Sequence, residues 1–132
     1  MKRARLLLSA IAVITISVPA VAQSPGKSEP KRSCFYFNQL DNWKAPDAKT
    51  IYIRVGMHRI YRLDLAGSCS GLRSPGAFLI TKIRGPHTIC SAIDWDLHVA
   101  QSWQDIPQAC IVKKMTELSP AEIAEIPPKA KP

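Results

Sequence analysis

The sequence lacks the motifs that would assign it to a known catalytic or metal-binding class. No C-x-x-C pair occurs, so neither a thioredoxin-type redox site nor a zinc knuckle has its usual local spacing. No nucleophile elbow is present, and the serines of the 68–74 loop form no S-x-x-K motif. The glycine-rich stretch at 67–71 lacks the lysine and the following helix of a phosphate-binding loop. The sequence therefore predicts no catalytic residue and no cofactor, and an enzyme is the less favoured class.

Long apolar runs are also scarce, and the single one lies at the N-terminus. The first 22 residues have a basic start, an apolar run over 6–18, and small residues at Ala20 and Ala22. This order is typical of a secretory signal peptide, and we expect cleavage before Gln23. A retained membrane anchor is the alternative, but this 13-residue run, interrupted by Ser and Thr, is shorter than the roughly 20 residues that cross a bilayer. No cysteine stands at the cleavage point, so a lipid-anchored N-terminus is not predicted.

Removal of the signal leaves one small domain. Of the 132 residues, 110 would remain, which suffices for one modest hydrophobic core. The net charge falls from +8 to +5, because the signal carries three basic and no acidic residues. A charge of this size leaves contact with an anionic surface open, although ordinary solubility explains it equally well. We expect a periplasmic or secreted protein without a further membrane span.

Four cysteines, all in the part that would remain, predict two disulfides. An even number in an exported chain of this size is typical of a disulfide framework. Four cysteines allow three connectivities, and spacing alone does not choose among them. The pairing favoured here joins Cys69 with Cys90 and Cys34 with Cys110.

The hydrophobic pattern predicts one β-rich domain over 34–125, between a flexible leader at 23–33 and a disordered tail at 126–132. Period-two alternation over 50–55 and 59–65, around a glycine turn, predicts a hairpin. A second hairpin is expected from 77–84 and 88–99, and a last strand from 110–118. Shorter β-prone and turn segments are expected over 35–37 and 38–49. Ser119, Pro120 and Glu122 predict a short helix that runs to about Glu125.

These elements define a mainly β fold class: a small antiparallel sheet or barrel built of hairpins, with a short C-terminal helix and two disulfides. The sequence does not choose between a sandwich and a barrel.

One group of side chains is a candidate metal site. On the strand predicted over 88–99, Asp94, Asp96 and His98 would project to one side and the intervening apolar residues to the other. Two carboxylates and an imidazole on adjacent positions could bind a divalent cation. The same alternation is what a half-buried strand needs for packing alone, so these three residues are weak metal candidates. The remaining histidines, His58 and His87, fall in predicted turns.

Basic residues recur along the predicted strands and could form a surface for a polyanion. With two tyrosines they would make an aromatic and basic face. Scattered, solvated charge is the alternative interpretation, and an exported protein is not expected to meet nucleic acid. The residues concerned are Arg54, Arg59, Arg62, Arg73, Lys82, Arg84, Lys113, Lys114, Tyr52 and Tyr61.

The order of these features resembles a known family. The hairpin over 50–65 with its Gly-Ser-Cys loop, the segments Thr88-Ile89-Cys90 and Cys110-Ile111-Val112, and the terminal helix resemble the exported bacterial proteins of domain-of-unknown-function family 6491. The resemblance covers about 34–125 and implies an exported, cysteine-containing domain, with no activity, substrate or catalytic residue. The favoured hypothesis is a non-enzymatic binding or envelope-associated structural protein with an unknown envelope or extracellular partner. The alternative is a metal-dependent enzyme or metal-binding protein that uses Asp94, Asp96 and His98.

Overall fold

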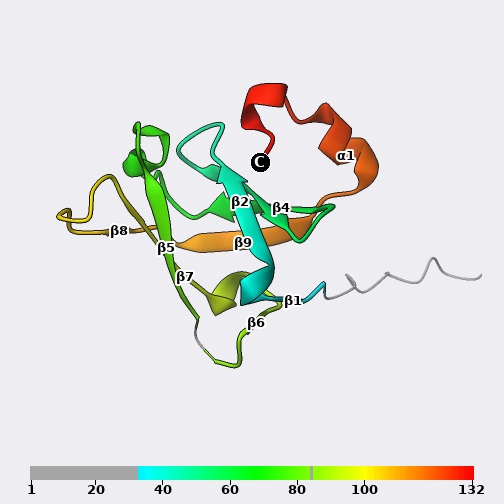
Figure 1. The fold of residues 1–132 in the computed structure, drawn as a ribbon, viewed down its shortest axis with the longest axis horizontal. Helices are drawn as coiled ribbons and strands as arrows, with labels where there is room; N and C mark the ends of the chain where they lie inside the picture. Colours follow the sequence, from blue (N-terminus) through cyan, green and yellow to red (C-terminus); the bar gives the residue numbers. More distant parts are fainter. Residues whose placement is uncertain (1–32, 84) are drawn as a thin grey trace, which may run out of the picture.

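The computed structural model describes residues 33–83 and 85–132 and shows a mainly β fold (Figure 1). The predicted signal peptide, and all of the predicted leader except Ser33, lie outside these residues. The described strands form three small antiparallel sheets, followed by one short α-helix. The predicted fold class is confirmed.

The largest sheet is built on the predicted hairpin. β3 (Thr50–Val55) and β4 (Arg59–Leu65) pair along their whole length, and Gly56 in the turn between them has a φ of +59° that favours glycine. β2 (Leu40–Lys44) and β9 (Val112–Glu117) add to the two sides, which gives the order β2-β3-β4-β9. As the alternation predicts, one face of the hairpin is buried: Ile51, Ile53, Val55, Tyr61, Leu63 and Leu65.

The second sheet corrects the predicted second hairpin. β5 (Phe78–Ile83) pairs with β7 (Trp95–Ala100), and β8 (Gln108–Ala109) lies on the other side of β7. The strand predicted over 88–99 is interrupted, because η3, a 3-10 helix over Ala92–Asp94, separates β6 (Thr88–Ile89) from β7. β6 pairs instead with β1 (Phe35–Tyr36) and forms the third sheet.

The hydrophobic core contains buried side chains from all three sheets. Phe35 of β1 and Ile89 of β6 join Leu63 of β4 and Leu97 of β7 in one cluster. The Phe35 ring packs 4.8 Å from the Tyr61 ring and 6.3 Å from that of Trp95, measured between centroids. The first described strand is therefore part of the core.

The two predicted disulfides are present, but the favoured pairing is wrong. Cys34 is bonded to Cys90, and Cys69 to Cys110. The pairing of β1 with β6 places Phe35 opposite Ile89, so the residues just outside this pair, Cys34 and Cys90, are brought together. Cys69 and Cys110 are both buried in the core cluster.

The predicted C-terminal helix is confirmed as α1 (Pro120–Glu125). Ser119 caps it: its side chain accepts a hydrogen bond from the backbone N–H of Glu122, whose carboxylate accepts one from the Ser119 N–H. Among the described residues, none of the helices has the length and hydropathy needed to cross a membrane.

The predicted disordered tail is wrong. η4, a 3-10 helix over Pro128–Ala130, follows α1, and Ile126 and Ala130 are buried against Ile60 in a second cluster. Ile60 faces away from the main core because it alternates with Tyr61 along β4. The end of the chain thus covers part of the outer face of the four-stranded sheet, as Figure 1 shows at the C-terminus.

Candidate functional site

A cleft opens where one stretch of chain passes from one sheet to another. Gln108 and Ala109 pair with β7, and the backbone N–H of Cys110 still donates to the Leu97 carbonyl, at 2.8 Å. From Val112 onward the chain pairs with β4 instead. Because β7 and β9 diverge after Cys110, the space between them is lined by side chains rather than closed by ladder hydrogen bonds. We call this space the β9 groove.

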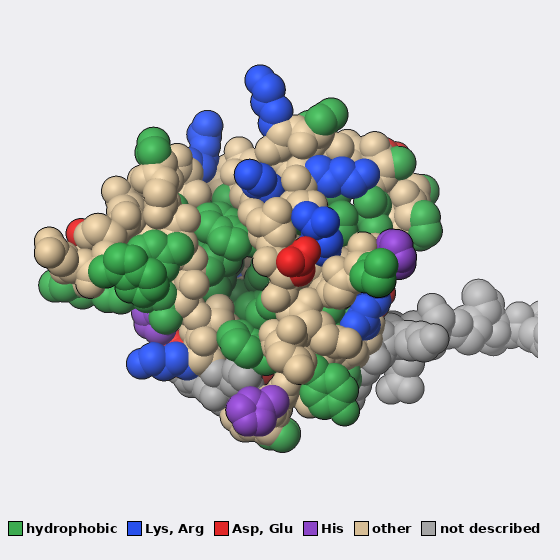
Figure 2. Space-filling model, in the orientation of Figure 1, with side chains coloured by type: hydrophobic (Ala, Val, Ile, Leu, Met, Phe, Trp, Pro, Cys, Tyr) green, Lys and Arg blue, Asp and Glu red, His purple; other side chains and the backbone are tan. Residues whose placement is uncertain are grey.

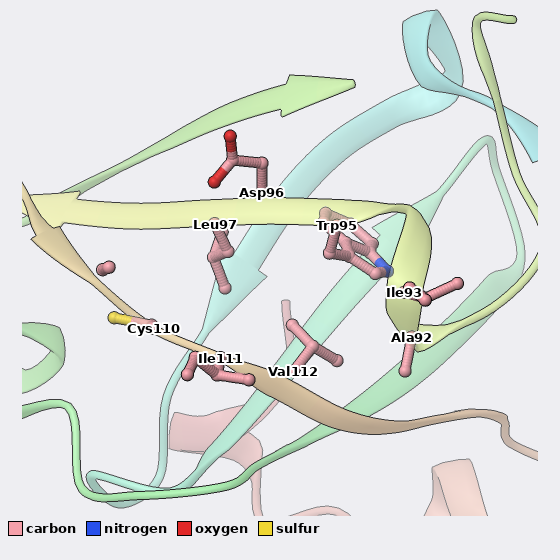
Figure 3. Close-up of a pocket in the computed structure, with 9 residues that line it drawn as sticks. Ala92, Ile93, Trp95, Asp96, Leu97, Cys110, Ile111 and Val112 are labelled. Atoms are coloured by element: carbon pink, nitrogen blue, oxygen red, sulfur yellow. The ribbon is translucent and has the colours of Figure 1, made fainter. Parts of the chain in front are cut away.

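The first part of the β9 groove is a hollow of about 480 Å³ whose lining side chains are mostly apolar, shown in Figure 3. Trp95 and Leu97 of β7 line it from one side and Val112 from the other. Ile93 and Ile111 stand at this hollow with 82% and 72% of their surface exposed. Exposed large apolar side chains beside a hollow are typical of a binding surface.

The second part is a wider hollow of about 1360 Å³ that continues along β9 and shares Ala92 with the first. Met115 lines this second hollow and accepts a hydrogen bond from the indole N–H of Trp95, which lines the first, at 3.4 Å to its sulfur. Across from β9 the wall is made by the chain around η3, including Cys90, Ser91 and Ala92. The two hollows lie along the outer edge of β9, the first at Val112 and the second from Lys114 to Glu117.

The edge of β9 that faces the groove offers backbone hydrogen-bonding groups. β9 is the last strand of its sheet, and no strand among residues 33–83 and 85–132 pairs with its outer side. The Leu118 N–H donates to the Ile60 carbonyl at 2.9 Å, and in an antiparallel ladder these inward bonds recur at every second residue. The N–H and C=O groups of Met115 and Glu117 therefore point outward, into the groove, whereas a register shift interrupts the alternation at Lys113.

A polar cluster closes the wide end of the β9 groove. The Tyr61 hydroxyl donates to the Glu117 carboxylate at 3.0 Å, and Arg59 donates to the same hydroxyl at 3.2 Å. Ser33 contacts both Tyr61 and Glu117 through its hydroxyl. Burial, reinforced by the Glu117 carboxylate, raises the pKa of the Tyr61 hydroxyl above its ordinary value. The hydroxyl thus stays protonated at neutral pH and acts as a fixed link between β4 and β9.

The predicted metal candidates do not come together. Asp94 belongs to η3 and not to the strand, and its carboxylate accepts hydrogen bonds from the backbone N–H groups of Cys90 and Ser91, at 2.9 and 2.8 Å. Asp96 and His98 do share a face of β7, with 3.7 Å between carboxylate and imidazole. Figure 3 shows the Asp96 carboxylate on the side of β7 away from the groove. No group of three or more metal-ligating side chains is found in the part of the chain that the structure describes.

The hydrogen bonds accepted by the Asp94 carboxylate can be tested by measuring the stability of the fold at acid pH. The backbone hydrogen bond from Cys90, followed by those from Ser91, lowers the pKa of the Asp94 carboxyl. Because the folded-state pKa lies below the ordinary value of about 3.9, this carboxylate stabilises the fold above that value, and the contribution is lost as the pH falls through the folded pKa. We expect Asp94→Asn to lower the free energy of unfolding by no more than about 1 kcal/mol at pH 7. In urea titrations, the difference from the parent chain should shrink as the pH falls below the ordinary carboxyl pKa of about 3.9, and a difference that does not change with pH would contradict these hydrogen bonds.

The predicted aromatic and basic face is also wrong in its central residues. Tyr61 is buried in the core, with 1% of its surface exposed, whereas Tyr52 lies on the opposite face against the second cluster. Arg54 pairs with Asp41 at 3.4 Å and Arg62 with Asp64 at 2.8 Å. The strand cations are thus partly balanced by carboxylates of the same sheet.

The residues of the β9 groove were missed by the sequence analysis. One signal could have found them: Cys110, Ile111 and Val112 are consecutive apolar residues. Successive side chains of a strand point to opposite faces, so a core on one side cannot bury all three. Ile111 is the one left outside.

The fold and the groove define a small, disulfide-bonded β domain with an open strand edge. The chain belongs to the family of unknown function DUF6491, whose sequence profile matches residues 2–131. Comparisons with curated proteins and with solved structures find no match.

Proposed function

We propose that this chain is an exported, non-enzymatic binding protein that holds an extended segment of another polypeptide along the edge of β9. The observation that carries the proposal is the outward backbone groups of Met115 and Glu117, facing a groove of two joined hollows. A peptide strand added to a sheet edge gains affinity from main-chain hydrogen bonds and specificity from pockets for alternate side chains.

The chemistry of the groove supports an extended, partly apolar ligand. An added strand would place every second side chain toward the apolar hollow between Trp95 and Val112, beside Ile93 and Ile111. Its other residues would face solvent. The exposed surfaces of the two isoleucines would be covered on binding, which gives the association a hydrophobic contribution.

Export is supported by the sequence and is compatible with the disulfides. The basic start and apolar run of the first 22 residues are typical of a cleaved signal, and two disulfides suit an oxidising compartment outside the cytosol. Intact-mass measurement of the product recovered from a bacterial periplasm checks this part. A mass that includes residues 6–18 would contradict cleavage.

The binding proposal predicts which variants lose a peptide. A displayed library of random ten-residue peptides supplies the probe, and a synthetic copy of a selected peptide is titrated by isothermal calorimetry. We expect Ala92→Arg, which fills the join between the hollows, to weaken binding at least tenfold, and Ile93→Ser/Ile111→Ser to do the same. Met57→Arg is the matched control, because it adds the same charge at an exposed turn position away from the groove.

Amide hydrogen exchange gives a second test, because apolar contact alone would not produce an alternating pattern of amide protection along β9. On binding, the N–H groups of Met115 and Glu117 should gain protection, while those of Lys114 and Thr116, already directed at β4, should change little. Protection without this alternation, or binding unaffected by Ala92→Arg, would overturn strand addition at β9. Failure to select any peptide that binds the parent chain would overturn the proposed function itself.

A further inference from the structure

A second surface lies at the end of the molecule remote from α1. The loop over 101–107, between β7 and β8, carries Trp103 and Ile106 with 89% and 95% of their surface exposed. Figure 1 shows this loop, in yellow, projecting from the body of the fold. The Trp103 ring packs on that of Phe78, with 4.5 Å between centroids. We call Phe78, Trp103 and Ile106 the apolar tip.

The loop holds the apolar tip outward in a defined shape. The Asp105 carboxylate accepts hydrogen bonds from the backbone N–H groups of Gln101 and Ser102, at 3.2 and 2.8 Å. This acidic side chain is therefore turned back onto its own loop. The loop also meets η2 (Ser70–Arg73), because Ile106 and Gly71 line one small hollow. Packing on one side and the Asp105 bonds on the other leave Trp103 and Ile106 facing solvent.

Cations stand around the apolar tip. Arg73 lies at the end of η2 and lines a hollow with Lys44 and Ala77, the residue before Phe78. Lys82, farther along β5 from Phe78, is also exposed. Figure 2 shows a broad hydrophobic area at this end of the molecule, with Lys or Arg side chains above and below it. The chain that remains after the predicted cleavage carries a net charge of +5, so its long-range attraction is for anions.

We propose that the apolar tip docks the domain on an anionic lipid bilayer. A tryptophan has an apolar ring and one polar N–H, and such rings are enriched at the boundary between acyl chains and headgroups. Attraction of Arg73, Lys44 and Lys82 to acidic headgroups adds to the burial of Trp103 and Ile106. The tip is a convex projection and not a hollow. A specific protein interface buries about 800 Å² on each partner, far more than two projecting side chains supply, whereas a bilayer admits a projection of any outline.

Vesicle binding tests the proposal. The chain, purified from the periplasm, is mixed with phosphatidylglycerol vesicles and with phosphatidylcholine vesicles, and the bound fraction is measured by sedimentation. We expect at least tenfold stronger partition to the anionic vesicles, with loss of binding at high salt. A blue shift of the tryptophan fluorescence should accompany binding, and Trp103→Phe should abolish the shift while keeping most of the binding.

Paired variants separate the apolar tip from other exposed hydrophobic residues. Trp103→Ser/Ile106→Ser should weaken partition at least tenfold, whereas Tyr36→Ser/Met57→Ser, which removes two exposed side chains elsewhere, should leave it unchanged. Equal binding of the two double variants would overturn the proposal, and so would absence of binding by the parent chain. A dimer that dissociates in Trp103→Ser/Ile106→Ser, without vesicle binding, would assign the tip to a second copy of the chain. None of these results bears on peptide binding at β9, because the two surfaces share no residue.

Discussion

Replacement of Cys69 and Cys110 by alanine is expected to lower the free energy of unfolding by about 3–5 kcal/mol, which approaches the total stability of a domain of this size. The bond joins residues 41 positions apart, and its loss releases that loop in the unfolded chain. Both cysteines also belong to the main core cluster, so their removal leaves the core less filled. Urea titration followed by far-ultraviolet circular dichroism measures the change.

The position of this bond explains why a large effect is expected. Cys69 follows β4, and Cys110 stands where the chain leaves β7 for β9. The bond thus holds together the crossing that forms the β9 groove. Cys34→Ala/Cys90→Ala is the matched comparison, with a longer separation of 56 residues but an exposed Cys34 next to two-residue strands. We expect the smaller loss there, because neither Cys34 nor Cys90 belongs to the buried core cluster, so their removal leaves no cavity in it. A larger loss from the Cys34–Cys90 pair would contradict this ranking.

Phe35→Ala is expected to have the second large effect, a loss of about 3–5 kcal/mol. Phe35 exposes only 2% of its surface and packs between the rings of Tyr61 and Trp95. Truncation would leave a cavity bordered by two large rings on different sheets, and neither can move in without breaking its own contacts. Chemical denaturation of the variant checks the value.

Tyr36→Ala, at the neighbouring position, is the control. The Tyr36 side chain points out of the same strand and is 62% exposed, so we expect a change within about 0.5 kcal/mol. Similar losses at the two positions would mean that β1 contributes as a backbone element and not through the buried Phe35 ring. The contrast therefore measures how far the first strand belongs to the core.

The sequence predicted the features that depend on local pattern. Alternation over 50–65 and a glycine turn were enough for the β3–β4 hairpin, because the period of two decides which face is buried. The capped helix after Ser119 was equally local, since its hydrogen bonds join residues only three apart. Interruption of the strand predicted over 88–99 was missed, because Asp94 accepts backbone hydrogen bonds that compete with a ladder.

Features that depend on partners distant in the sequence could not be predicted in this way. The cysteine pairing follows from β1 lying beside β6, a contact between segments more than 50 residues apart. The C-terminal segment is ordered because Ile126 and Ala130 pack on Ile60, on the outer face of β4. The β9 groove has the same origin, since it exists only because one strand leaves β7 and joins β4. Composition and residue spacing do not determine these long-range contacts.

The order of the cysteines along the chain has a consequence for how the native protein is reached. The loops closed by the two disulfides overlap in the sequence, because Cys69 lies within the segment between Cys34 and Cys90, while Cys110 lies beyond it. A polypeptide that emerges N-terminus first presents the thiols of Cys34 and Cys69 before either true partner has appeared. Oxidation at that moment would trap a mismatched bond, so maturation requires either delayed oxidation or a catalyst that reshuffles sulfur bonds.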